Sequence, residues 1–139
     1  MYQKILIALD ATEADETILR HITELAHASG SSIILLHVAD GWAARFFGED
    51  AVSREVEEDK AYLEKVRARL AAEGLQVEAA LAYGEPADQI VKWIASSGCD
   101  LVAMSTHGHR FISDLLYGST ADTVRHRVDV PVLLLKARK

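Results

Sequence analysis

The stretch KILIALD, residues 4–10, is a short run of aliphatic side chains that ends in an aspartate. A continuous apolar run of this length is typical of a strand buried on both faces, as in a parallel sheet. Residues 13–29 follow with apolar side chains at helical spacing. Thr12 is the predicted N-cap of this helix, with Asp15 three residues on, and Gly30 is its predicted end. The beginning of the chain therefore predicts a strand followed by a helix.

The alternation of strand and helix continues along the chain. Further apolar runs predict four more strands, at residues 32–38, 75–83, 100–105 and 130–137. Helical spacing predicts three more helices, at residues 53–73, from Pro86 to the glycine at 98, and near 119–128. Such an alternation favours an α/β fold with a five-stranded parallel sheet covered by helices on both faces, Rossmann-like, in a single domain of residues 1–139. The pattern leaves the order of the strands open.

The charge of the chain bears on the kind of partner that it can bind. The chain of 139 residues has a formal net charge of −6, which disfavours general nucleic-acid binding. Residues 105–139 nevertheless hold six Lys or Arg against three Asp or Glu. This local excess of positive charge is compatible with a small bound anion, and equally with a solvated surface of uneven charge.

No segment indicates a membrane, a leader or a disulfide. The apolar run at the start is too short for a signal peptide, and no stretch approaches the roughly 18 apolar residues of a membrane helix. Cys99 is the only cysteine, so no internal disulfide or multi-cysteine metal site can form. We expect a soluble cytoplasmic protein with no membrane partner.

Three loops at the carboxyl ends of strands are candidate ligand sites, because ligands of parallel α/β sheets bind there. They follow the strands ending near residues 9, 38 and 105. The third loop reads STHGHRFISDLLYGST, and Gly118, Ser119 and Thr120 precede a predicted helix. Free N–H groups at a helix start can hold an anion, although a turn with an N-cap explains the same residues. Because G-x-x-x-x-G-K-[ST] and G-x-G-x-x-G are absent, a P-loop NTPase and an ordinary dinucleotide-dependent dehydrogenase are disfavoured.

Histidines suggest a metal site only weakly. His107 and His109 lie two apart, with His126 further on, but no cysteine or carboxylate cluster completes a ligand set. We therefore predict no dedicated metal site. His37 lies within an apolar strand, and we expect a buried histidine with hydrogen-bond partners.

Several stretches, in order along the whole chain, resemble the universal stress protein family. They are ALDAT at the end of the first strand, LLHV in the second, GEPADQI, DLVAMSTHG with nine residues before GS, and VPVLLL in the last strand. The resemblance implies an adenine nucleotide alpha hydrolase-like fold and binding of ATP, ADP or AMP, with Mg²⁺ carried by the phosphates. Many members of the family bind ATP through G-x-x-G, nine residues, then G-[S/T]. Here Ser105 replaces the first glycine, and Phe111 stands where many relatives carry a small residue.

The resemblance implies a nucleotide site at matching positions of this chain. Asp10 matches the acidic residue near the nucleotide, and Val38 the residue whose backbone meets adenine. The full implied set is Ala8, Leu9, Asp10, Val38, Met104, Ser105, His107, Gly108, Arg110, Gly118, Ser119 and Thr120.

The resemblance also implies a nucleotide-dependent dimer in stress response or signalling, paired through the last strand from Val130 to Ala137. One alternative is a dimerising interaction module that binds no nucleotide, and another is a slow ATPase. Asp10, His107 and Arg110 are candidates for catalysis only by expected proximity, so we assign no catalytic residue. The segment from Trp42 to Val52 is either a flap or partner surface, or packs on the helix after it.

Overall fold

The computed structural model of the protein describes residues 1–39, 48–106 and 120–137. Its centre is one sheet of five strands in the order β3-β2-β1-β4-β5, and all neighbouring pairs are parallel. The strands are β1 (Lys4–Leu9), β2 (Ser32–Ala39), β3 (Val77–Tyr83), β4 (Leu101–Ser105) and β5 (Val132–Leu135). The predicted α/β fold with a parallel sheet is therefore confirmed, and the structure adds the order of the strands.

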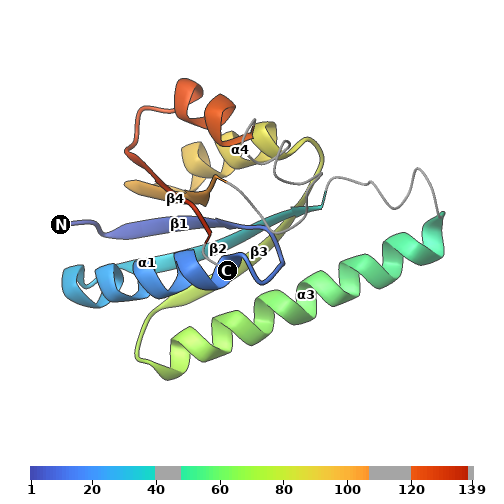
Figure 1. The fold of residues 1–139 in the computed structure, drawn as a ribbon, viewed down its shortest axis with the longest axis horizontal. Helices are drawn as coiled ribbons and strands as arrows, with labels where there is room; N and C mark the ends of the chain where they lie inside the picture. Colours follow the sequence, from blue (N-terminus) through green and yellow to red (C-terminus); the bar gives the residue numbers. More distant parts are fainter. Residues whose placement is uncertain (40–47, 107–119, 138–139) are drawn as a thin grey trace.

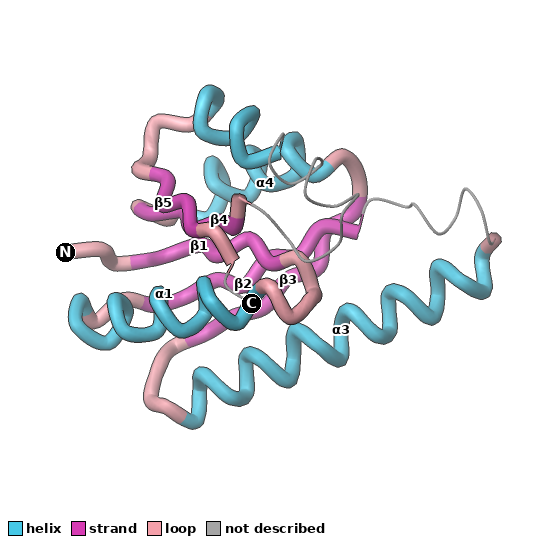
Figure 2. Tube along the Cα trace, viewed as in Figure 1, coloured by secondary structure: helices cyan, strands magenta, loops and turns pink. Residues whose placement is uncertain are grey.

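Helices cover both faces of the sheet (Figure 1). They are α1 (Asp15–Ser29), α3 (Glu49–Ala72), α4 (Pro86–Ser97) and a helical segment at residues 120–127. Figure 2 shows α1 and α3 on one face, with α4 and residues 120–127 on the other. Across the described residues, no helix combines the length and the apolar character needed to span a bilayer.

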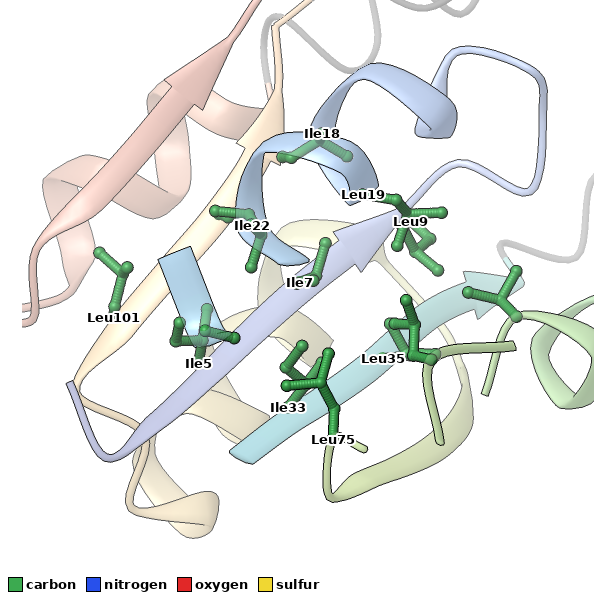
Figure 3. Packing of buried hydrophobic residues seen from close by; sticks show 14 of the residues in the cluster. Ile5, Ile7, Leu9, Ile18, Leu19, Ile22, Ile33, Leu35, Leu75 and Leu101 are labelled. Carbon is green, nitrogen blue, oxygen red and sulfur yellow. The ribbon is translucent and has the colours of Figure 1, made fainter. Parts of the chain in front are cut away.

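The alternation of side chains along β1 creates two cores, one on each face. Ile5 and Ile7 pack against Ile18 and Ile22 of α1 in the cluster that Figure 3 shows. Leu6 points to the opposite face and belongs to the cluster under α4. All five side chains are fully buried. Each buried aliphatic side chain contributes roughly 1.5–3 kcal/mol, which explains why the apolar runs of the sequence coincide with the central strands.

Several boundaries differ from those predicted. α1 begins at Asp15 with Ala14 at the N-cap, so the predicted capping box with Thr12 is wrong. The carboxylate of Asp15 bonds instead with the loop that follows β1. The predicted C-cap is confirmed, since Gly30 has a left-handed φ of 69°.

The third helix and the last strand differ in length from the predictions. α3 begins at Glu49, four residues before the predicted start at 53. β5 spans only Val132–Leu135 because its ladder with β4 ends at Ser105. Residues 40–47 lie outside the described residues, so the role predicted for Trp42 to Val52 stays a prediction.

Candidate functional site

A pocket lies at the carboxyl ends of β1, β2 and β4. It is lined by Ala8, Leu9, Asp10, Leu36, Val38, Pro86, Ile90, Met104 and Ser105. The chain runs from β1 outward to β2 and β3 on one side, and β4 and β5 lie on the other side. The pocket therefore lies where the strand order reverses, which is the usual ligand position in open α/β sheets.

Six predicted site residues come together in this pocket. They are Ala8, Leu9, Asp10, Val38, Met104 and Ser105. The parallel register explains their proximity, because Ala8 pairs with Met104 and Leu9 with His37, next to Val38. Residues predicted from strand ends thus meet as expected.

The remaining predicted site residues belong to the loop after β4. His107, Gly108, Arg110, Gly118 and Ser119 lie outside the described residues. Thr120 is described, at the beginning of the helical residues 120–127, and is buried. It is not among the described residues that line the pocket.

Three pocket residues were missed by sequence reasoning. Leu36 lies two positions before Val38 and therefore shares its face of β2. Pro86 and Ile90 come from α4, which packs against β2 and β3. The sequence predicted that Pro86 starts this helix and that Ile90 belongs to its apolar face, but it could not show that this end of α4 reaches the pocket.

Ser105 has the least satisfied side chain in the pocket. It is only 4% exposed, and its Oγ has no hydrogen-bond partner among the described residues. A buried hydroxyl without a partner costs roughly 1–3 kcal/mol, so such groups are uncommon outside functional positions. Because this hydroxyl belongs to the pocket lining, Ser105 is a candidate ligand-binding residue.

The backbone beside the pocket is held by the carboxylate of Asp15. The N–H of Asp10 donates to Asp15 Oδ1 at 2.8 Å, and the N–H of Ala11 donates to Oδ2 at 2.9 Å. The hydroxyl of Tyr62, on α3, donates to Oδ2 at 2.7 Å. Burial raises the pKa of Asp15, whereas these three hydrogen bonds and the charge of His37 act to lower it. Burial and the nearby carboxylate raise the pKa of Tyr62 above its ordinary value, so its hydroxyl remains a donor at neutral pH.

His37 is the buried, bonded histidine that the sequence predicts. Its Nδ1 donates to the carbonyl of Leu9 at 2.8 Å, and its Nε2 lies 3.4 Å from Asp59 Oδ2. Burial alone lowers the pKa of the imidazole, but the bond with Asp59, the bond with Leu9 and the charges of Asp59 and Asp15 outweigh it, so the pKa is raised. The side chain therefore holds the end of β1 and is not offered to the pocket as a ligand.

The pocket combines an apolar wall with polar groups at the strand ends. Leu36, Val38 and Ile90 supply aliphatic surface, while Asp10 and Ser105 supply a carboxylate and a hydroxyl. A mostly apolar lining with a few polar groups is typical of sites that bind small molecules. Within the described parts of the chain, no three His, Cys, Asp or Glu side chains form a group able to hold a metal ion.

Comparison with known proteins connects this geometry to one family. The model of the family described as "Universal stress protein family" matches residues 1–136. Universal stress protein MJ0577 of Methanocaldococcus jannaschii is 27% identical over 157 aligned residues, which cover 99% of this chain and 97% of the relative. The solved structure of MJ0577 has a TM-score of 0.88 and 30% identity, covering 100% of this chain and 99% of the other.

Two further solved structures share the fold at lower identity. A universal stress protein in complex with cAMP has a TM-score of 0.69 and 21% identity, covering 97% of each chain. The universal stress protein from Archaeoglobus fulgidus in complex with dAMP has a TM-score of 0.72 and 23% identity, covering 97% of this chain and 98% of the other. The family model spans nearly the whole sequence, and the fold agrees with it. The chain belongs to the universal stress protein family.

Proposed function

We propose that the protein binds an adenine nucleotide, ATP or its products ADP and AMP, in the pocket at the carboxyl edge of the sheet. The observation that carries the proposal is the convergence of Asp10, Val38 and Ser105 from three strands on one pocket where the strand order reverses. The partly apolar wall suits the adenine ring, and the buried hydroxyl of Ser105 suits a polar group of the ribose or the first phosphate.

The family supports the choice of an adenine nucleotide. Two proteins with this fold hold cAMP and dAMP, each of which contains adenine and a phosphate. In the proposed complex the backbone of Val38 meets the adenine ring and Asp10 lies near the ribose. The outer phosphates lie toward the start of the helix at residues 120–127, because the amino-terminal end of a helix favours an anion.

The loop after β4 completes the proposed site. His107, Gly108, Arg110, Gly118 and Ser119 contact the phosphates, together with Thr120, and the phosphates carry Mg²⁺. These roles follow from the resemblance of the loop to the family's phosphate-binding pattern, in which Ser105 takes the place of a glycine.

The first test asks whether the protein binds nucleotide at all. The purified protein is heat-denatured and the released small molecules are analysed, and titration calorimetry follows with ATP, ADP and AMP in the presence of Mg²⁺. We expect a released adenine nucleotide, saturable binding, or both. Neither release nor binding would contradict the proposal and favour an interaction module that works without nucleotide.

The second test places the binding site. Ser105→Val replaces the buried hydroxyl with two methyl groups, so we expect at least a tenfold loss of affinity, equivalent to about 1.4 kcal/mol. The matched control is Ser32→Val, the same change at the opposite end of the sheet, where Ser32 begins β2. We expect the control to bind as the wild type does. Equal affinity of both variants would place the nucleotide elsewhere.

We further propose that the protein acts as a homodimer paired through β5 and that nucleotide occupancy controls its associations. β5 forms one edge of the sheet and exposes Leu134, and an open apolar edge is a usual site of pairing. Phosphate release above background that disappears in Asp10→Ala, with binding retained, would favour a slow ATPase.

A further inference from the structure

The backbone of three consecutive residues at the edge of the pocket, Leu9, Asp10 and Ala11, forms hydrogen bonds with side chains from other parts of the fold. His37 bonds with the carbonyl of Leu9, and Asp15 accepts from the N–H groups of Asp10 and Ala11. Leu9 and Asp10 line the pocket. The orientation of this edge is therefore set by groups that do not themselves line the pocket.

Both holding side chains contact α3. Tyr62 donates to Asp15, which belongs to α1, and Asp59 lies 3.4 Å from the imidazole of His37, which belongs to β2. Asp59 and Tyr62 are three residues apart, so they lie on the same face of α3. We call Asp15, His37, Asp59 and Tyr62 the α3 clamp. It connects one helix to three successive backbone groups of the pocket edge.

The conformation that the clamp holds is one the chain does not adopt readily. Ala11 has a φ of 61°, a left-handed value that costs a residue other than glycine roughly 1–2 kcal/mol. Such a conformation persists where surrounding contacts determine it, and the bond from Ala11 N–H to Asp15 supplies one. The clamp therefore fixes a strained turn directly after the pocket residue Asp10.

Stability alone is a poor explanation of the clamp. The Asp15 side chain is completely buried, and burying a carboxylate costs several kcal/mol before its hydrogen bonds compensate. An apolar residue at this position would lie on the same face of α1 as the buried Ile18 and Leu19 and would avoid that cost. An apolar residue could not accept hydrogen bonds from two successive backbone N–H groups, and it could not fix the direction in which these groups point.

We propose that Asp15 and Tyr62 are positioning residues for nucleotide binding, which hold the backbone of Asp10 and Ala11 in the geometry that the ligand requires. The inference rests on the proposed function, and it adds two residues outside the pocket to the determinants of affinity. It also makes α3 the element through which a contact elsewhere on the molecule would reach the pocket.

The test compares Tyr62→Phe and Asp15→Asn with the wild type. Tyr62→Phe removes one hydroxyl and keeps the packed ring, and we expect a loss of nucleotide affinity of about tenfold, equivalent to about 1.4 kcal/mol. Asp15→Asn removes one of the acceptor oxygens, and we expect a loss at least as large. Amide hydrogen exchange should become faster at Asp10 and Ala11 in both variants. Thermal unfolding verifies that each variant is folded at the temperature of the titration.

The matched control is Val66→Ala, one turn along α3 from Tyr62. Val66 is buried in the cluster against which Tyr62 packs, so its truncation destabilises the protein, and its aliphatic side chain forms no hydrogen bond with residues 9–11. We expect the control to keep wild-type affinity and wild-type exchange at Asp10 and Ala11. If affinity falls equally in Val66→Ala and Tyr62→Phe, the clamp acts only through stability and the inference is overturned.

The outcomes separate this inference from the proposed function. A wild type that binds no adenine nucleotide overturns the proposed function and the premise of the inference with it. A wild type that binds, with clamp variants that bind equally well, overturns the inference alone. Weaker binding and faster exchange in the clamp variants only, with the control unchanged, support both.

Discussion

At the scale of single residues, two buried polar side chains near the carboxyl edge of the sheet, Asp15 and Ser105, differ in their hydrogen bonds. Asp15, three residues after the predicted N-cap, resembles the far end of a capping box in the sequence. In the structure it accepts from Asp10, Ala11 and Tyr62. Ser105 shows the opposite case, since its buried hydroxyl has no partner among the described residues. Asp15 therefore shapes the edge of the pocket, whereas Ser105 is a candidate to bond with a ligand.

His37 should make stability depend on pH. Its pKa in the folded protein is raised above the ordinary 6.5, so the folded state keeps a proton that the unfolded chain loses. The stabilisation is complete below 6.5 and is lost as pH rises from 6.5 through the raised pKa. The groups that act on the imidazole are Asp59 of α3, Asp15 of α1 and the carbonyl of Leu9.

The measurement is the free energy of unfolding by urea at several pH values above 6 in wild type and in His37→Asn, which keeps a donor but does not titrate. We expect the wild-type free energy to fall with rising pH more steeply than that of the variant, by at most about 1.4 kcal/mol per pH unit. Because the charges of Asp15 and His37 act on each other's pKa, the difference between the two proteins reports His37 together with its coupling to Asp15. Parallel curves would contradict the raised pKa.

At the scale of elements, a helix end is predicted correctly from the sequence when the residues at that end determine it by themselves. α4 begins with Pro86 at its first turn, as the sequence predicts, and ends at Gly98 with a left-handed φ of 74°. Proline and glycine mark these ends through their own backbone conformations, and no contact with a distant residue is needed. The start of α1 was misplaced because Asp15 bonds with a strand-end loop and with α3, and neither contact has a signature at helical spacing.

The cap of α4 gives a test at this scale. The carboxylate of Glu85, at the N-cap, accepts from the N–H groups of Ala87 at 3.2 Å and Asp88 at 2.8 Å. Glu85→Ala should lower the free energy of unfolding by about 1 kcal/mol, because two N–H groups lose their acceptor. Glu85→Ser is the control, since serine is itself a preferred N-cap residue. Denaturant unfolding measures both, and we expect Glu85→Ser to lose less stability than Glu85→Ala. Wild-type stability in Glu85→Ala would contradict a stabilising cap.

At the scale of the whole molecule, the order of the strands decides where a ligand and a partner can lie. With β1 at the centre, its carboxyl end lies between those of β2 and β4, and the pocket forms there. β3 and β5 become the two edges. Among the described residues of these edges, the large hydrophobic side chains that are exposed are Tyr83 on β3, at 55%, and Leu134 on β5, at 38%. The sheet therefore offers two edges, of which the proposed dimer uses β5.

The proposed dimer predicts an asymmetry between the edges. Leu134→Glu places a charge on β5 and should convert the dimer into a monomer, because a desolvated carboxylate at an apolar interface is costly. Tyr83→Glu places the same charge on β3 and should leave the dimer intact. Size-exclusion chromatography with light scattering measures the mass of each. A monomeric wild type would contradict dimerisation, and a dimer that only Tyr83→Glu disrupts would place the interface on β3.

The sequence by itself determined the parallel α/β fold, the central strands and the strand-end residues of the pocket. This was possible because burial on both faces leaves a continuous apolar run in the chain, and because parallel strands end at the same edge. Only the tertiary structure decided the strand order, the contribution of α4 to the pocket and the bond between Asp15 and Tyr62, which are 47 residues apart. Those features depend on which distant surfaces pack together, and local periodicity does not record that choice.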